Sequence, residues 1–74
     1  MAFKARVHVR RPDATKSEYL GEVDLDQRPF TGQQIFLRYK GRRVVGQIES
    51  VAPPNWEQSG VIPFVRVVQG WPER

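Results

Sequence analysis

The chain has 74 residues, with 12 lysines and arginines against 8 acidic residues, one histidine and no cysteine. This length predicts one small domain over residues 1–74, and the lack of cysteine excludes disulfides and thiolate metal sites. No apolar run approaches the ~20 residues of a membrane-spanning helix, and Lys4, Arg6 and His8 interrupt any apolar leader, so we expect a cytoplasmic protein.

The first predicted strand covers residues 2–10, where apolar and basic side chains alternate. Its apolar face carries Phe3, Ala5, Val7 and Val9, and its polar face carries Lys4, Arg6, His8 and Arg10. Pro12 cannot donate a ladder hydrogen bond, so the residues that follow form a loop. The basic face is open to two interpretations, a phosphate-binding stripe or the solvated side of a strand.

The second predicted strand covers residues 19–26 and carries acids that match the bases of the first. In a register whose residue numbers sum to 30, the facing pairs are His8–Glu22, Arg6–Asp24 and Lys4–Asp26. Such cross-strand pairs contribute about 0.2–1 kcal/mol each. We therefore favour a self-neutralised, solvated face over a phosphate-binding stripe at this site.

The third and fourth predicted strands, residues 33–40 and 43–51, form a hairpin. Gly41-Arg42 fits a two-residue turn with glycine first. The resulting pairs are Tyr39–Val44, Leu37–Gly46 and Ile35–Ile48, so the apolar residues share one face. The outer face then carries Phe36, Arg38 and Val45, and Lys40 lies opposite Arg43.

The fifth predicted strand covers residues 61–68. Pro63 lacks a ladder donor, which predicts an edge strand, a bulge or a strand start. Five short strands favour an all-β fold, a small closed or half-open barrel, with a flat sheet in a dimer as the alternative. Aromatic residues expected in or over the core are Phe3, Tyr39, Trp56, Phe64 and Trp71.

Charge is segregated along the chain. Residues 1–12 sum to +4, residues 13–26 to −4, residues 27–48 to +5 and residues 49–74 to −1, which gives the net +4. The first two blocks can neutralise each other across the first hairpin. The third block has no evident acidic partner for its bases, which are Arg28, Arg38, Lys40, Arg42 and Arg43. Two bases that face each other across a hairpin tip are a local cost of the kind found at functional sites.

The stretch GQQIFLRYKGRRVVGQIESV, Gly32 to Val51, resembles the KOW-type element of SH3-like barrels in ribosomal and transcription-elongation proteins. The matching positions are Gly32, Ile35, Leu37, Gly41, Gly46 and Ile48. Val44-Val45 departs from the small or polar residues of the family. The resemblance implies a small five-stranded SH3-like barrel whose basic turn approaches RNA, which maps onto Lys40, Arg42 and Arg43.

The sequence lacks the groups that an enzyme would need. His8 is the one candidate imidazole base, and its charged neighbours favour a surface residue paired with Glu22. There is no phosphate-binding glycine loop. The spacing of Glu22, Asp24 and Asp26 could attract a hard cation, but the bases expected opposite them argue against it, so we expect neither cofactor nor metal. The chain is therefore predicted to be a non-enzymatic binding module.

Two partners remain open for that module. The first is nucleic acid, with RNA favoured, bound by phosphate contacts and a stacking surface; the site residues are Arg38, Lys40, Arg42, Arg43 and Phe36. The second is a protein or another copy of the chain, bound through the Phe36/Val45 face or an edge strand containing Pro63.

Overall fold

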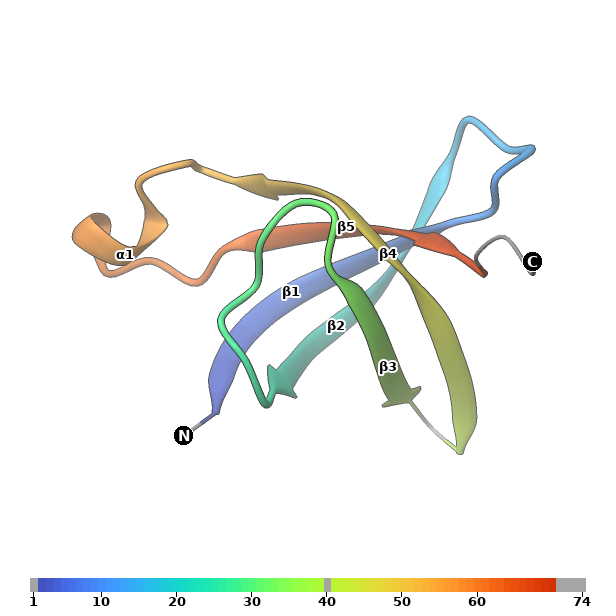
Figure 1. Ribbon diagram of the computed structural model, residues 1–74, viewed down its shortest axis with the longest axis horizontal. Helices are drawn as coiled ribbons and strands as arrows, with labels where there is room; N and C mark the ends of the chain where they lie inside the picture. The colour runs from blue at the N-terminus through green and yellow to red at the C-terminus, as the bar shows by residue number, and fades with distance from the viewer. Residues whose placement is uncertain (1, 40, 71–74) are drawn as a thin grey trace.

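The protein is all-β apart from one short helix (Figure 1). The computed structural model describes residues 2–39 and 41–70. Its elements are β1 (Phe3–Arg10), β2 (Ser17–Leu25), β3 (Gln34–Tyr39), β4 (Arg42–Ala52), α1 (Trp56–Ser59) and β5 (Phe64–Gln69). Within the described ranges, no helix is long and apolar enough to cross a membrane.

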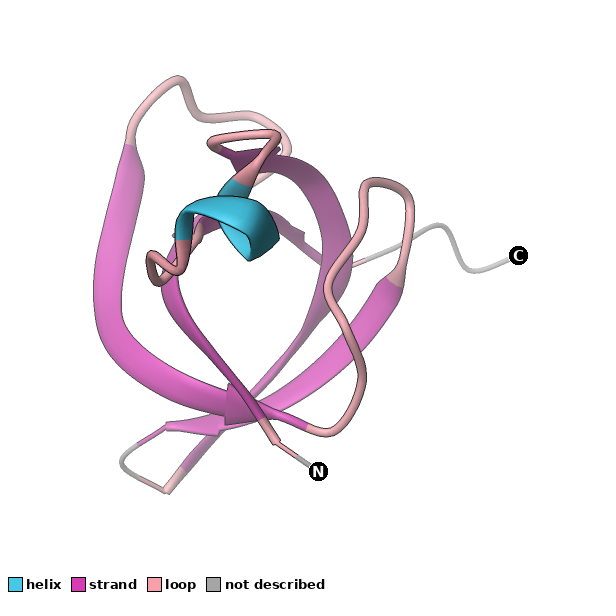
Figure 2. Ribbon diagram, turned by 90° about the vertical axis from the view of Figure 1, so that its left-hand side faces the viewer, coloured by secondary structure: helices cyan, strands magenta, loops and turns pink. Residues whose placement is uncertain are grey.

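The five strands form one mixed sheet in the order β2-β1-β5-β4-β3. β5 pairs parallel with β1 and antiparallel with β4, and the other pairings are antiparallel. The sheet curls into a half-barrel, with α1 at one end (Figure 2). The edges of the sheet are therefore β2 and β3.

Pro63 directly precedes β5, a strand that has a neighbour on each side. Of the three places predicted for this proline, the strand start is confirmed and the edge strand is wrong. The Pro63 carbonyl accepts a hydrogen bond from the Arg6 N–H at 2.9 Å, which begins the contact between β1 and β5.

The core lies on the concave side of the sheet, as the alternation predicts. Its buried members are Ala5, Val7, Val9, Leu20, Leu25, Ile35, Leu37, Val44, Ile48, Val65 and Val67. Trp56 is half-buried and packs edge-to-face on Phe3, with ring centroids 6.5 Å apart. The prediction of Phe64 in the core is wrong, because this residue lies on the outer face with 46% of its surface exposed. The expectation for Trp71 lies outside the described residues, as does the side chain of Tyr39.

Both predicted hairpin registers are wrong by two residues. A shift of two leaves each side chain on the face of the sheet that was predicted for it. In β1–β2 the pairs are Lys4–Asp24 and Arg6–Glu22, whose residue numbers sum to 28. The register then shifts between Val7 and His8, so His8 lies opposite Tyr19. This bulge turns Leu20 into the core, where 3% of it is exposed.

The β4–β5 contact explains one glycine of the hairpin. A Cβ at Gly46 would lie 2.4 Å from the Val68 carbonyl oxygen and 2.6 Å from Cγ1 of Val67. Real Cβ atoms do not approach backbone that closely, so no other residue fits without movement of β5. Gly46 therefore brings the β3–β4 hairpin close against the central strand of the sheet.

Candidate nucleic-acid interface

The β3–β4 hairpin protrudes at the end of the molecule remote from α1 (Figure 1). Its last pair is Tyr39–Arg42, so Arg42 belongs to β4 and the prediction of a Gly41-Arg42 turn is wrong. Gly41 has φ +77°, a left-handed conformation that glycine adopts without steric cost. The sequence therefore predicted the hairpin between these two strands correctly, but not the residues that pair across it.

The corrected register puts Arg38 directly opposite Arg43. The Ile48 N–H donates to the Gln33 carbonyl at 2.8 Å, which makes that pair a hydrogen-bonded one. Hydrogen-bonded and non-hydrogen-bonded pairs alternate, so Arg38 and Arg43 form a non-hydrogen-bonded pair, the kind in which side chains approach most closely. The facing bases predicted at Lys40 and Arg43 are therefore found at Arg38 and Arg43.

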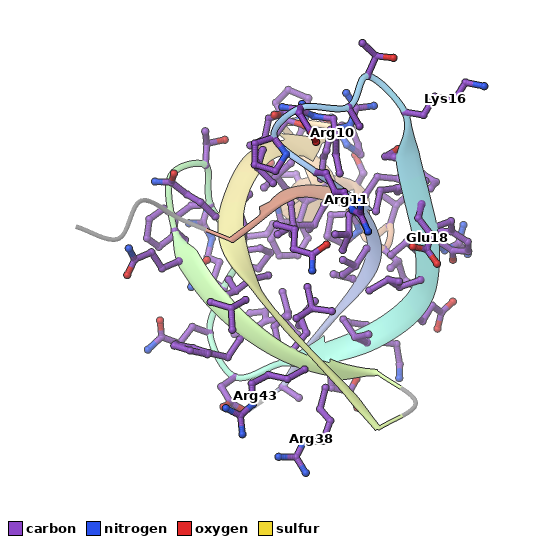
Figure 3. All side chains as sticks on the ribbon, turned by 90° about the vertical axis from the view of Figure 1, so that its right-hand side faces the viewer. Arg10, Arg11, Lys16, Glu18, Arg38 and Arg43 are labelled. Carbon is purple, nitrogen blue, oxygen red and sulfur yellow. The ribbon has the colours of Figure 1, made fainter. Side chains whose placement is uncertain are left out.

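The two guanidinium groups project from the outer face near the hairpin tip (Figure 3). Both side chains are exposed. Neither has a hydrogen-bond or ion-pair partner among residues 2–39 and 41–70. Two like charges are thus held side by side at the cost of their mutual repulsion.

Most other bases in the described chain have acidic partners. The ion pairs are Lys4–Asp24 (3.4 Å), Arg6–Glu22 (3.6 Å), Arg28–Glu57 (2.8 Å), Arg10–Glu49 (2.5 Å) and Arg66–Glu49 (3.8 Å). The prediction of a charge ladder on β1–β2 is confirmed with different partners. The prediction that Arg28 lacks a partner is wrong, because Glu57 of α1 comes from a part of the chain far away in sequence.

Arg10 is a structural residue. Its Nη1 donates to the Ala14 carbonyl at 2.8 Å, and its Nη2 bonds Glu49 on β4. It thereby ties the β1–β2 loop to the sheet. The side chains of Arg11 and Lys16 in the same loop have no partner in the described structure, but Asp13 and Glu18 balance their charge within that stretch.

Phe36 completes the hairpin site. It is 70% exposed on the outer face and lies opposite Val45. The structure thus brings together three of the predicted site residues, Phe36, Arg38 and Arg43. Lys40 lies outside the described residues, and so does the side chain of Arg42, whose backbone pairs with Tyr39.

A second exposed surface was missed by the sequence analysis. His8 packs against Tyr19 and Phe64, with ring centroids at 4.9 and 5.9 Å and ring planes tilted by 42° and 44°. The Arg6 guanidinium lies 5.6 Å from the centre of the Phe64 ring. We call these four residues the aromatic surface. His8 therefore contacts rings rather than the predicted Glu22. The available signal was the alternation of Phe64 with Arg66, which puts both on the outer face.

The aromatic surface differs in charge from the hairpin. Arg6 is paired with Glu22, and the nearby Arg66 with Glu49. Beside it, a mostly apolar groove of about 520 Å³ is lined by Arg6, Pro53, Val61, Ile62 and Phe64. The described residues contain no cluster of three or more His, Asp or Glu side chains that could hold a metal ion.

Comparison with known proteins does not assign this chain to a family. No protein-family model matches the chain, and no significant match was found among curated proteins or solved structures.

Proposed function

We propose that this protein is a small, non-enzymatic cytoplasmic module that binds nucleic acid, with RNA the favoured class, through the outer face of the β3–β4 hairpin. The observation that carries the proposal is the facing Arg38–Arg43 pair, which is exposed and has no acidic partner among the described residues. Phosphate oxygens would relieve the repulsion between the two guanidinium groups. Arginine suits this task because its planar fork can donate two hydrogen bonds to one phosphate.

Phe36 gives the same face a surface for bases. Base stacking on an aromatic side chain tolerates any sequence and contributes about 1–3 kcal/mol per base. The exposed ring lies two residues before Arg38 on the same face of the hairpin. We therefore propose a single-stranded segment whose phosphates meet the arginines while a base stacks on Phe36.

The proposed family relationship points in the same direction. The KOW-like stretch spans the two consecutive strands β3 and β4, and the sheet is a curled, five-stranded one. These features support an SH3-like barrel as the proposed finer classification. The basic turn of such elements approaches RNA, which places the proposed contact at the same hairpin.

A fluorescence-anisotropy titration with single-stranded and double-stranded probes tests the binding. We expect a dissociation constant in the micromolar range or weaker at low salt. Neutralising two phosphates of a single strand predicts a log–log salt slope of about −1.4 from this pair. The absence of any binding at tens of micromolar protein would contradict the proposal.

The double variant Arg38→Glu/Arg43→Glu localises the contact. We expect the affinity for the probe to fall by about tenfold or more, because two attractive contacts with phosphate become repulsive. The matched control is Lys4→Glu/Arg28→Glu, which changes the net charge equally at two bases that already have acidic partners. Equal losses of probe affinity in the two double variants would indicate a general effect of net charge. That result would contradict the hairpin as the binding site.

The aromatic surface favours a protein partner as the second candidate function. Its charges are balanced, its Tyr19 and Phe64 rings are about half exposed, and Arg and aromatic residues are the types enriched at interface centres. A Phe64→Ser variant would weaken a protein complex captured through this surface while leaving probe binding by the hairpin intact. Loss of probe binding in Phe64→Ser would instead assign the aromatic surface to the nucleic-acid site.

A further inference from the structure

The basic side chains of the described structure fall into two groups, those with an acidic partner and those without. The members of the first group, each ion-paired with a carboxylate, are Lys4, Arg6, Arg10, Arg28 and Arg66. Among the lysine and arginine side chains that the structure describes, those without such a partner are Arg11, Lys16, Arg38 and Arg43. All of this second group lie at the end of the molecule remote from α1, one pair on the β1–β2 loop and the other on the hairpin (Figure 3). The unpaired positive charge is therefore gathered at one end.

A pocket of about 340 Å³ lies at this end, between the β1–β2 loop and the end of β5. Among its lining residues are Arg11, Ala14, Lys16, Ser17, Glu18 and Gln69. We call it the loop pocket. Its lining carries two positive charges against the one negative charge of Glu18, and Asp13 is not part of it. A hollow with this balance of charge attracts anions.

The β1–β2 loop that forms one wall of the pocket is held in place by Arg10. The Arg10 guanidinium donates to the Ala14 carbonyl and to Glu49 of β4. The Ala14 N–H in turn donates to the Arg11 carbonyl at 3.1 Å. Arg11 and Lys16 therefore extend from a loop that is already fixed, which lowers the entropic cost of holding both around one anion.

The loop pocket supplies donors of the kind that a phosphate group accepts. The planar guanidinium of Arg11 can donate two hydrogen bonds to one phosphate, and Lys16 adds a compact positive charge. The side chains of Ser17 and Gln69 are further donors, and neither has a hydrogen-bond partner in the described part of the chain. Several donors around one pocket match the several acceptor oxygens of a phosphate.

We propose that the loop pocket binds a second phosphate of the single strand that the hairpin binds, so that the strand crosses this end of the molecule. The inference rests on the proposed function and extends it, because it sets the length of nucleic acid required. The molecule is at most 24 by 23 Å across this end. A stacked strand advances about 3.4 Å per nucleotide, so about seven nucleotides are enough to reach both pairs of bases.

Inorganic pyrophosphate tests the loop pocket without nucleic acid. In heteronuclear NMR spectra of the full chain, the amide signals of Ala14, Ser17 and Gln69 should shift and saturate, with a dissociation constant on the order of 10 mM. Sodium chloride at equal ionic strength should not produce these shifts. No shift at these amides up to about 50 mM pyrophosphate, or the same shifts with sodium chloride, would overturn the pocket.

Two double variants locate the pyrophosphate shifts. Arg11→Gln/Lys16→Gln should lose them, whereas Arg38→Glu/Arg43→Glu, which changes the hairpin alone, should keep them. Shifts that survive in Arg11→Gln/Lys16→Gln would overturn the pocket. Because no oligonucleotide is present, this result does not depend on whether the hairpin binds nucleic acid.

Single-stranded probes of about three and about ten nucleotides test whether one strand reaches both places. The short probe reaches one pair of bases at a time and should show a log–log salt slope of about −1.4. The long probe neutralises phosphates at both pairs and should show about −2.8. A slope of about −1.4 for both lengths would overturn the crossing and leave the hairpin proposal standing. The absence of binding by either probe would contradict the proposed function and the crossing together.

The Arg11→Gln/Lys16→Gln variant assigns the additional slope to the loop pocket. It should return the slope of the long probe to about −1.4. The matched control Lys4→Gln/Arg28→Gln makes the same change in net charge at two bases that have acidic partners, and it should keep about −2.8. The same fall in slope for both variants would make the effect one of overall charge and would overturn the crossing.

Discussion

Single residues fix how closely the strands of this small sheet can approach. Gly46 has no side chain because the Val68 carbonyl occupies the place of a Cβ. Arg10 holds a loop carbonyl and the Glu49 carboxylate with one guanidinium group. Neither role is visible in the sequence, because Val68 and Glu49 belong to strands far along the chain and alternation shows Arg10 only as one more base.

A Gly46→Ala variant tests the close approach of β4 and β5. Overpacking of this kind typically costs about 1–3 kcal/mol, and the contact here is with backbone that cannot rotate away. We expect the free energy of unfolding in urea to fall by about 2 kcal/mol or more. Ser50→Ala, an exposed position on the same strand, is the control and should change it by less than about 0.5 kcal/mol.

Within the strands, the alternation of apolar and polar residues predicted correctly which side chains face the core, but it did not predict which residues pair across the hairpins. The inward sets Ala5, Val7 and Val9 of β1, and Ile35 and Leu37 of β3, are buried as expected. A shift of two residues leaves every side chain on the same face. The apolar pattern alone therefore could not decide whether the paired residue numbers of β1 and β2 sum to 30 or to 28. The bulge in β2 was also hidden, because Leu20 has the outward phase of its strand until the extra residue reverses it.

Two neighbouring substitutions test the bulge. Leu20→Ala should cost about 2–4 kcal/mol, since a nearly fully buried leucine leaves a cavity. Tyr19→Ala, at a position 52% exposed, should cost under about 1 kcal/mol. Strict alternation without the bulge predicts an outward Leu20, so a small effect of Leu20→Ala would refute the register shift. Thermal unfolding followed by circular dichroism compares the two.

The candidate site was partly predictable at the same scale. The basic excess in residues 27–48 pointed to the hairpin, and exposure of Phe36 followed from its phase. The aromatic surface was not predicted, because it combines β1, β2 and β5, whose neighbourhood depends on the sheet order. The pairing of Arg28 with Glu57 was missed for the same reason.

For the whole molecule, the sheet order sets which strands are held most firmly. β1, β5 and β4 each have two hydrogen-bonded neighbours, whereas β2 and β3 have one. Backbone opening is governed by local burial and pairing, so native-state hydrogen exchange should be slowest at Val7, Val65 and Val67. The Ile48–Gln33 hydrogen bond and the register of β3 with β4 direct the amides of Gln34 and Arg38 away from β4. These amides should exchange fastest among the strand residues. Comparable protection across β3 and β5 would contradict this order.

The parallel ladder between β1 and β5 has a consequence for how the fold is acquired. It joins the first and the last described strands at the middle of the sheet, about 58 residues apart in sequence by the Arg6–Phe64 pair. Long-range pairing of this kind slows folding because the loop must close before its contacts form. During synthesis, the β1–β2 and β3–β4 hairpins would both leave the ribosome before β5, the strand that lies between them in the sheet. The central strand is thus the last to arrive, and it converts two separate hairpins into one sheet.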